Sequence, residues 1–312
     1  MKYRTLGKTR LQVSALAFGG SSLGGVFRDI DEAEAIRSVH VAVENGINLI
    51  DTAPYYGSTR AESVLGRALK DLPRSSYYLA TKVARYGPDL SDFDFSAARV
   101  TRSVDESLAR LGVDYVDFIQ VHDMEFGDIR QIIHDTLPAL LKLRDAGKAR
   151  FVGITCLPIR LFREVMDQIE IDQIQSYCHY CLNDTSLADL LPYLREKDVA
   201  IFNSAPLAMR LLSSEGPPAW HPAPASLRER CAAASRYCRE RGADLGRLAL
   251  QYAMANPDIH THIVGTARPE RVLENIRNAE EPLDHDLLAG VLRILEPVHN
   301  VTWPSGRPEN AP

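Results

Sequence analysis

The chain has 312 residues, of which 45% are hydrophobic and 25% are charged, as in ordinary soluble globular proteins. Its net charge of −5 at pH 7 argues against nucleic acid or an anionic membrane surface as the main partner. No apolar run reaches the roughly 18 residues of a transmembrane helix, and the polar residues after Met1 do not form a secretory signal, so we expect a cytoplasmic protein.

The first predicted element is a small hairpin at residues 2–14, built around a Gly7-Lys8-Thr9 turn. An alternation of apolar, strand-like runs and helical patterns then begins. Eight strands are predicted, at 15–18, 47–50, 77–80, 115–121, 151–154, 173–176, 199–203 and 262–264. The helical patterns lie at 31–44, 60–70, 96–110, 128–146, 158–168, 185–197, 226–241 and 269–279.

Eight strand–helix units in sequence predict a parallel sheet that closes into a (β/α)8 TIM barrel. The competing doubly wound fold would place Gly-x-Gly-x-x-Gly after its first strand, and the glycine-rich run at 19–24 has the wrong spacing. A Pro-rich stretch at 215–224 is expected to form a long loop at the barrel mouth. Extra C-terminal helices are expected at about 244–255 and 284–296. Because no linker divides the chain, residues 1–312 are expected to form a single domain.

Three of the predicted strands end in ionisable side chains, which are Asp51, Lys82 and His122. Barrel strands deliver their last side chains to one shared mouth, and Tyr56 lies in the loop that follows Asp51. Each residue alone has an ordinary explanation, as a helix cap, a solvated lysine or a hydrogen-bonded rim histidine. Four such residues on consecutive strand–helix junctions favour one common site.

These four residue types suit proton transfer to a carbonyl or from a hydroxyl group. The pKa of an unperturbed tyrosine is near 10, so we expect the Lys82 ammonium to favour ionised Tyr56, while Asp51 keeps the lysine charged. His122 can orient the substrate oxygen. Tyr78 and Lys82 also match the Tyr-x-x-x-Lys of short-chain dehydrogenases. Positions four apart in a strand are separated by about 13 Å, however, so we exclude Tyr78.

The five cysteines are too few for a disulfide scaffold in a chain of this length. Cys178 and Cys181 form a C-x-x-C pattern, but it lacks the second ligand pair of a zinc site and the helix start of a redox motif. We therefore expect packed thiols and no metal.

Several short motifs are spread along the chain. They are Leu-Ala-Phe-Gly-Gly at 16–20, Ile-Asp-Thr-Ala-Pro-Tyr-Tyr-Gly at 50–57, Ala-Thr-Lys at 80–82, His122, Gly-Ile-Thr at 153–155, Ala-Pro-Leu at 205–207 and Glu-Asn at 274–275. With these motifs the chain resembles the aldo-keto reductase family over nearly its whole length. The resemblance implies the family's catalytic set at Asp51, Tyr56, Lys82 and His122, and a nicotinamide cofactor that lies extended across the barrel mouth.

The resemblance also implies which residues contact the cofactor. They are Gly20, Ser21, Asp51, Thr155, Ser204, Pro206, Leu207, Gly265, Thr266, Arg271, Glu274 and Asn275. Relatives that use NADP carry a lysine after the eighth strand and an arginine six residues later. Gly265 stands at the lysine and Arg271 at the arginine, so one of two contacts to the 2′-phosphate is missing and NAD is predicted. Arg268 is a nearby cation that could compensate.

Three positions depart from the family's pattern. Thr155-Cys156 replaces the usual Ser-Asn, and Arg210 stands where glycine is common. The aromatic residue that often stacks on nicotinamide before Pro-Leu is also replaced, because the run is Asn203-Ser204-Ala205. Tyr177 or Tyr180 could supply the missing ring, although simple packing explains both tyrosines equally well.

Five further segments, 93–100, 122–127, 176–180, 216–222 and 295–306, resemble the sugar-oxidising members of the family. The resemblance implies oxidation of an aldose at C1 to its lactone. L-Galactose is the first candidate, with L-fucose and D-arabinose as alternatives. A general carbonyl reductase that uses NADPH and a non-enzymatic barrel subunit are the competing functions.

A sugar site must bind several hydroxyl groups, whereas a pocket for apolar aldehydes would have a mostly apolar lining. The predicted substrate residues are Tyr56, His122, Asp123 and Trp220. Glu125 and His221 are further candidates that are almost as readily explained as a hydrated rim. The expected partner is a small sugar, with no nucleic acid and no membrane, and both a monomer and a homodimer remain open.

Overall fold

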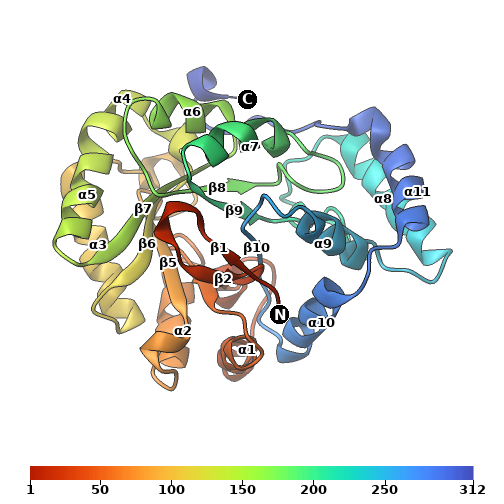
Figure 1. The fold of residues 1–312 in the computed structure, drawn as a ribbon, viewed down its shortest axis with the longest axis horizontal. Helices are drawn as coiled ribbons and strands as arrows, with labels where there is room; N and C mark the ends of the chain where they lie inside the picture. The colour runs from red at the N-terminus through yellow and green to blue at the C-terminus, as the bar shows by residue number, and fades with distance from the viewer. Residues whose placement is uncertain (312) are drawn as a thin grey trace.

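Eight parallel strands close into a barrel in the computed structural model, which describes residues 1–311 (Figure 1). The strands are β3 (Leu16–Gly19), β4 (Leu49–Asp51), β5 (Tyr78–Val83), β6 (Val116–Val121), β7 (Ala149–Cys156), β8 (Gln173–Tyr177), β9 (Ala200–Ser204) and β10 (Thr261–Val264). The ring closes because β10 pairs with both β9 and β3. All eight predicted strands are present, and the predicted (β/α)8 barrel is confirmed.

The predicted N-terminal hairpin closes the barrel at the amino ends of its strands. β1 (Tyr3–Thr5) pairs antiparallel with β2 (Gln12–Ser14). Leu6 and Val13 from the hairpin region pack with Phe118 and Phe202 in an apolar cluster inside the barrel. This apolar floor leaves the carboxyl ends of the strands as the open, polar end.

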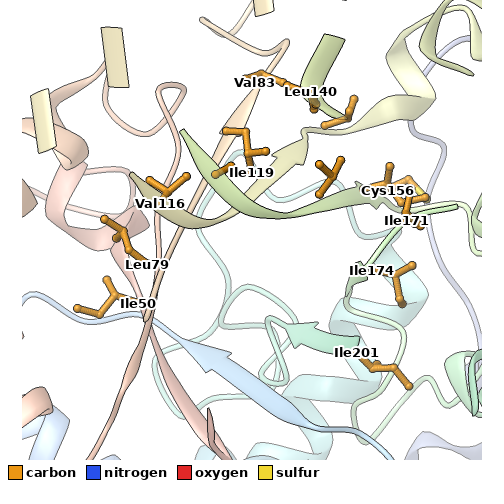
Figure 2. Packing of buried hydrophobic residues seen from close by; sticks show 14 of the residues in the cluster. Ile50, Leu79, Val83, Val116, Ile119, Leu140, Cys156, Ile171, Ile174 and Ile201 are labelled. Carbon is orange, nitrogen blue, oxygen red and sulfur yellow. The ribbon is translucent and has the colours of Figure 1, made fainter. Parts of the chain in front are cut away.

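Successive side chains of each strand point alternately into the barrel and out toward the helices. Leu49 and Phe118 belong to the inner floor cluster, whereas Ile50 and Ile119 belong to the larger cluster between strands and helices. Figure 2 shows this outer layer, with Ile50, Leu79, Val116, Ile119, Ile174 and Ile201 among its members. Each large buried aliphatic side chain contributes about 1.5–3 kcal/mol, so a slip in register would expose the layer and is strongly disfavoured.

Helices surround the barrel and agree closely with the predicted ranges. They are α1 (Glu32–Glu44), α2 (Arg60–Leu69), α3 (Ala97–Leu111), α4 (Ile129–Gln131), α5 (Leu137–Asp145), α6 (Arg160–Met166), α7 (Leu187–Glu196), α8 (Ala225–Arg239), α9 (Leu245–Ala255), α10 (Pro269–Glu280) and α11 (His285–Leu295). Within residues 1–311, no helix combines the length and the apolar character needed to cross a bilayer.

The predicted ring helix after β9 is wrong. Residues 226–241 were predicted for the ring and 244–255 as an addition to it. In the structure α9 packs against α10 and β10, whereas α8 packs against α11 outside the ring (Figure 1). Both helices are amphipathic, so periodicity could not decide between them. The informative difference is charge, because α9 carries only Arg247 and is buried on several sides, while α8 is rich in exposed charged residues.

The chain turns sharply over the open end of the barrel directly after four strands. Ala84, Asp123, Cys178 and Ala205 follow β5, β6, β8 and β9, and each has a left-handed backbone with φ between 47° and 80°. Left-handed geometry costs a non-glycine residue about 1–2 kcal/mol. Such strain tends to collect at functional sites, which makes this end of the barrel the place to look for chemistry.

Gly57 fixes the loop that carries Tyr56. It has φ +61°, and a Cβ atom there would lie 2.1 Å from the Gly24 carbonyl oxygen. We predict that Gly57→Ala lowers the free energy of unfolding by roughly 2–4 kcal/mol, through overpacking and backbone strain together. Gly112 is the matched control, with φ +68° and no neighbouring atom within 4 Å. Gly112→Ala should cost only the backbone strain of about 1–2 kcal/mol. Equal losses in urea unfolding would contradict the prediction.

Candidate active site

A buried ion pair lies at the open end of the barrel. Asp51 ends β4 and Lys82 lies on the neighbouring strand β5, and both are almost fully buried. The Lys82 ammonium donates to both Asp51 carboxylate oxygens at 2.7 Å and to the Thr52 carbonyl oxygen at 2.8 Å. All three ammonium hydrogens therefore have acceptors, which is what lets a lysine stay charged in a buried position.

Two glutamine side chains complete the support of the Asp51 carboxylate. Gln120 on β6 donates to it at 3.1 Å, and Gln175 on β8 donates at 3.4 Å and also reaches the Ser204 hydroxyl at 2.7 Å. Sequence reasoning missed both glutamines. Their buried positions inside predicted strands were the available signal, because a buried polar side chain requires a hydrogen-bond partner.

Tyr56 and His122 lie beside the ion pair. The Lys82 nitrogen is 5.1 Å from the centre of the Tyr56 ring. The Tyr56 and His122 rings meet edge to face, with centroids 5.7 Å apart. The fold therefore brings together all four predicted catalytic residues, which come from consecutive strands and the loop after β4.

The protonation of Tyr56 differs from the sequence-based expectation. Burial raises the pKa of Tyr56 well above 10, and the nearby Asp51 and Asp123 carboxylates raise it further. The nearby Arg85 guanidinium lowers the pKa of Tyr56 in part. The net shift favours the neutral phenol, opposite in direction to the expected stabilisation of the tyrosinate by Lys82. Burial likewise lowers the pKa of His122 to about 3, so its imidazole is neutral.

A second ion pair flanks these four residues. The Arg85 guanidinium donates to the Asp123 carboxylate at 2.6 Å and lies 3.6 Å from the centre of the Tyr55 ring. The Thr155 hydroxyl accepts from the Asp123 backbone N–H at 2.9 Å. Sequence reasoning missed Arg85, which follows β5 by two residues and had no motif to mark it. The pair holds Asp123 at the mouth with a compensated charge.

One cavity of about 810 Å³ occupies the open end of the barrel. Its wall contains all four predicted catalytic residues and the predicted substrate residues Asp123 and Trp220. It also contains most of the predicted cofactor residues, namely Gly20, Ser21, Asp51, Thr155, Ser204, Pro206, Leu207, Gly265 and Thr266. The other three, Arg271, Glu274 and Asn275, lie on α10 and are not part of this wall, although Arg271 lies 3.6 Å from Glu215, which is.

The cavity has features that fit a dinucleotide. A Cβ atom at Gly265 would lie 2.6 Å from the Gly19 carbonyl oxygen, so the strand ends approach each other closely there. No side chain caps the N-terminus of α10, which begins at Pro269, and the dipole of a helix favours negatively charged groups at its N-terminus. Arg268, the residue before α10, lines the cavity. These residues could hold an elongated anionic cofactor.

The three departures from the family pattern have distinct places. Cys156 is buried and does not line the cavity, while Arg210 does and pairs with Glu215 at 2.5 Å. Tyr177 lines the cavity. Tyr180 stacks on Tyr252 instead, with centroids 5.9 Å apart. Of the two candidates for the missing ring, only Tyr177 is in a position to face a cofactor.

Two of the suggested rim residues are not on the rim. Glu125 is fully buried and does not line the cavity, and His221 is buried with its Nε2 bonded to the Ala208 carbonyl oxygen at 3.0 Å. Trp220 behaves as expected of a mouth residue, because it is 52% exposed and its ring lies 5.8 Å from that of Phe27. The partners of Glu125 lie 32 to 180 residues away, which local sequence could not reveal, whereas His221 bonds within its own loop region to Ala208 and Ala223.

The remaining motifs carry no visible chemistry. Tyr78 and Lys82 belong to one strand, as predicted, and Tyr78 packs against the floor cluster at the opposite end of the barrel from the mouth. All five cysteines are free and buried. Within residues 1–311, no cluster of three or more potential metal ligands is present.

Comparisons with known proteins agree with this geometry. The model of the aldo/keto reductase family matches residues 15–296. The chain is 48% identical to L-galactose dehydrogenase of Arabidopsis thaliana, covering 99% of both chains. It is 34% identical to D-arabinose 1-dehydrogenase of Saccharomyces cerevisiae, covering 78% of this chain and 76% of that one. A holo-form aldo-keto reductase from Bacillus halodurans has a similar structure, with TM-score 0.77, 28% identity and 99% coverage of both chains.

The buried Glu125 gives a testable pH dependence. Burial, aided by Asp123, raises the pKa of Glu125 from 4.5 to about 8. The folded chain therefore keeps a proton that the unfolded chain loses, and stability should fall as pH rises through this window, by at most about 1.4 kcal/mol per pH unit. Glu125→Gln cannot lose this proton. Its stability advantage over the wild type in urea unfolding should therefore widen from about pH 5.5 to about pH 7.5.

The matched control for this measurement is the exposed Glu229 on α8. Glu229→Gln should keep a constant offset from the wild type over the same pH range. Parallel stability curves for Glu125→Gln and the wild type would contradict the prediction.

Proposed function

Since the chain belongs to the aldo/keto reductase family, we propose that it is an NAD-dependent aldose 1-dehydrogenase that oxidises a sugar at C1 to its lactone. L-Galactose is the first candidate substrate, with L-galactono-1,4-lactone as the product. The observation that carries the proposal is the single cavity in which Asp51, Tyr56, Lys82 and His122 meet. The earlier expectation of a cytoplasmic monomer or homodimer stays a prediction.

In the proposed reaction, the sugar's C1 hydroxyl group binds between Tyr56 and His122. The neutral His122 imidazole donates a hydrogen bond that fixes the reacting oxygen. NAD bound in this cavity would supply the acceptor for the hydride from C1, and the positive charge of its oxidised ring would favour ionised Tyr56. Tyr56 takes the hydroxyl proton as the C1–H bond breaks, and the Asp51–Lys82 pair holds the tyrosine ring in place. Because the ring oxygen is already bonded to C1, a cyclic sugar yields a lactone without water.

Two structural features support NAD as the cofactor. The lysine that meets the 2′-phosphate in NADP-using relatives would not fit at Gly265, because its Cβ atom would lie 2.6 Å from the Gly19 carbonyl oxygen. Arg271 already pairs with Glu274 at 2.7 Å and lies 3.6 Å from the Glu215 carboxylate. These carboxylates oppose a second phosphate at this position and can accept hydroxyl groups of an unmodified ribose.

The mouth also offers both kinds of surface that a sugar needs. The Asp123 carboxylate can accept sugar hydroxyl groups, and Arg85 beside it can donate to them. Phe27, Trp220 and Trp303 supply aromatic surface along the same cavity for the C–H face of the ring. The two curated relatives reported above are named for L-galactose and D-arabinose, which supports an aldose as the substrate class.

A carbonyl reductase that uses NADPH is the second candidate. The observation that favours it is Arg268, which lines the cavity and has only a 3.6 Å pairing with the exposed Glu270. It could meet a 2′-phosphate that Arg271 does not.

The role of Tyr56 is tested by removing one hydroxyl group. Tyr56→Phe keeps the ring, so the fold should survive, and general acid–base catalysis contributes roughly 100- to 10,000-fold. We predict a loss of turnover of that size with the best substrate. The matched control is Tyr55→Phe, which should stay within about tenfold of the wild type. A Tyr56→Phe enzyme within about threefold of the wild type, with unchanged circular dichroism, would show that the assignment is wrong.

The substrate and cofactor are tested together with a panel of aldoses. We predict production of NADH from L-galactose, L-fucose or D-arabinose, with a lactone identified by mass spectrometry. Because these sugars differ far from C1, one hydroxyl group should change kcat/KM among them by only about 10- to 1,000-fold. NAD and NADP are compared at matched concentration, and a higher kcat/KM with NADP would reverse the cofactor assignment. Fast reduction of aromatic aldehydes with no turnover of any aldose would end the proposal.

A further inference from the structure

Tyr177 lies on β8, beside the position on β9 where the family often has an aromatic residue. The family often places a ring at the end of the barrel strand that here ends in Ser204. In the parallel ladder between β8 and β9, Tyr177 pairs directly with Ser204. Both residues line the cavity, and Gln175 on β8 donates to the Ser204 hydroxyl at 2.7 Å. A small residue on β9 therefore leaves space beside a large ring on β8 at the same level of the barrel.

The Tyr177 hydroxyl group donates a hydrogen bond to the Glu125 carboxyl group, which lies outside the cavity wall. Glu125 accepts at Oε1 from the Tyr177 hydroxyl at 3.3 Å, from the Ser305 hydroxyl at 2.9 Å and from the Leu157 backbone N–H at 3.3 Å. Glu125 itself has no exposed surface and is not part of the cavity wall. It therefore acts on the cavity only through the residues that it holds.

The C-terminal segment is built around the same residue. The Glu125 carbonyl oxygen accepts from the Arg307 N–H and from the Asn310 side-chain amide, each at 2.9 Å. Gly306 packs so closely that a Cβ atom there would lie 2.6 Å from the Glu125 side chain. Residues 303–306 of this segment line the cavity. One buried glutamate thus joins the ring on β8 to the segment that walls the mouth.

We propose that Glu125 is a positioning residue for the proposed reaction, because its carboxyl group holds the Tyr177 ring against the nicotinamide and Ser305 against the sugar at the same time. This inference rests on the proposed function. It assigns no proton transfer to Glu125, and the four residues at the ion pair keep their roles. If the carboxyl group is removed, Tyr177 and Ser305 lose the hydrogen-bond acceptor that they share.

The main test compares two replacements of Glu125. Glu125→Gln keeps a side-chain carbonyl that accepts the same three hydrogen bonds, whereas Glu125→Met keeps the unbranched chain and removes both oxygens. We expect Glu125→Gln to stay within about threefold of the wild type in KM for the sugar. Glu125→Met should raise this KM and the dissociation constant of NADH, read by fluorescence, by about tenfold or more, while kcat changes less.

A double-mutant cycle separates this role from a general loss of packing. Tyr177→Phe and Ser305→Ala remove the two hydroxyl groups that Glu125 holds. In the background that carries both changes, Glu125→Met should alter KM by less than about twofold, because its partners are already gone. If Glu125→Met does not fold, Tyr177→Phe and Ser305→Ala are combined alone, and their effects on KM should be smaller together than the product of the single effects.

Asn310→Ala is the matched control, because it loosens the C-terminal segment at the Glu125 carbonyl oxygen and leaves the carboxyl group intact. It should lower stability and change the sugar KM by less than about threefold. An equal rise in KM for Asn310→Ala and Glu125→Met would overturn the inference, as would fully multiplicative effects in the cycle. If wild-type protein binds no NADH, the proposed function falls and this inference with it. Normal NADH binding with an unchanged KM in Glu125→Met overturns the inference alone.

Discussion

The buried pair of Asp51 and Lys82 is the constraint on which the open end of the barrel depends. Removing both charges from water costs several kcal/mol per ion, and mutual attraction repays this only with good geometry and further hydrogen bonds. Here the ammonium has three acceptors, and the carboxylate has two glutamine donors from other strands. The pair therefore links β4, β5, β6 and β8, and any shift of one strand would leave a buried charge unpaired.

This compensation sets the electrostatics of the whole cavity. Lys82 is paired with Asp51, and Arg85 with Asp123, and the Arg85 charge lowers the pKa of Tyr56 by less than burial and the two carboxylates raise it. Burial then dominates and keeps Tyr56 and His122 neutral. A site assembled in this way is ready to donate a proton. It accepts one only when a ligand brings positive charge beside the tyrosine, which ties the direction of the proposed reaction to the form of the bound cofactor.

The sequence was most informative where function and local structure coincide. Asp51, Lys82 and His122 each end an apolar run, so barrel topology alone placed them together. Arg85 and Gln175 could not be found in this way, and Glu125 was a candidate whose buried position was not foreseen, because the partners of all three lie between 29 and 180 residues away along the chain. The exchange of α8 and α9 has the same origin, since periodicity reports that a helix has a buried face and not which neighbour buries it.

The two ends of the barrel are stabilised by different interactions, and the mouth depends more on hydrogen bonds than the floor does. The floor is apolar and closed by the hairpin, so packing alone stabilises it. The mouth consists of loops with strained backbone at Ala84, Asp123, Cys178 and Ala205. Apolar packing of Ala84 and Cys178 offsets part of this strain, and ordered hydrogen bonds add to this stabilisation. The C-terminal segment is held at the mouth by polar contacts to Glu125 and Gly127 and by a bond from the Arg160 guanidinium to the Glu309 carbonyl oxygen. Trp303 adds apolar packing and a contact with His221. A change in a few buried polar groups can therefore reshape the substrate wall while the barrel beneath it stays intact.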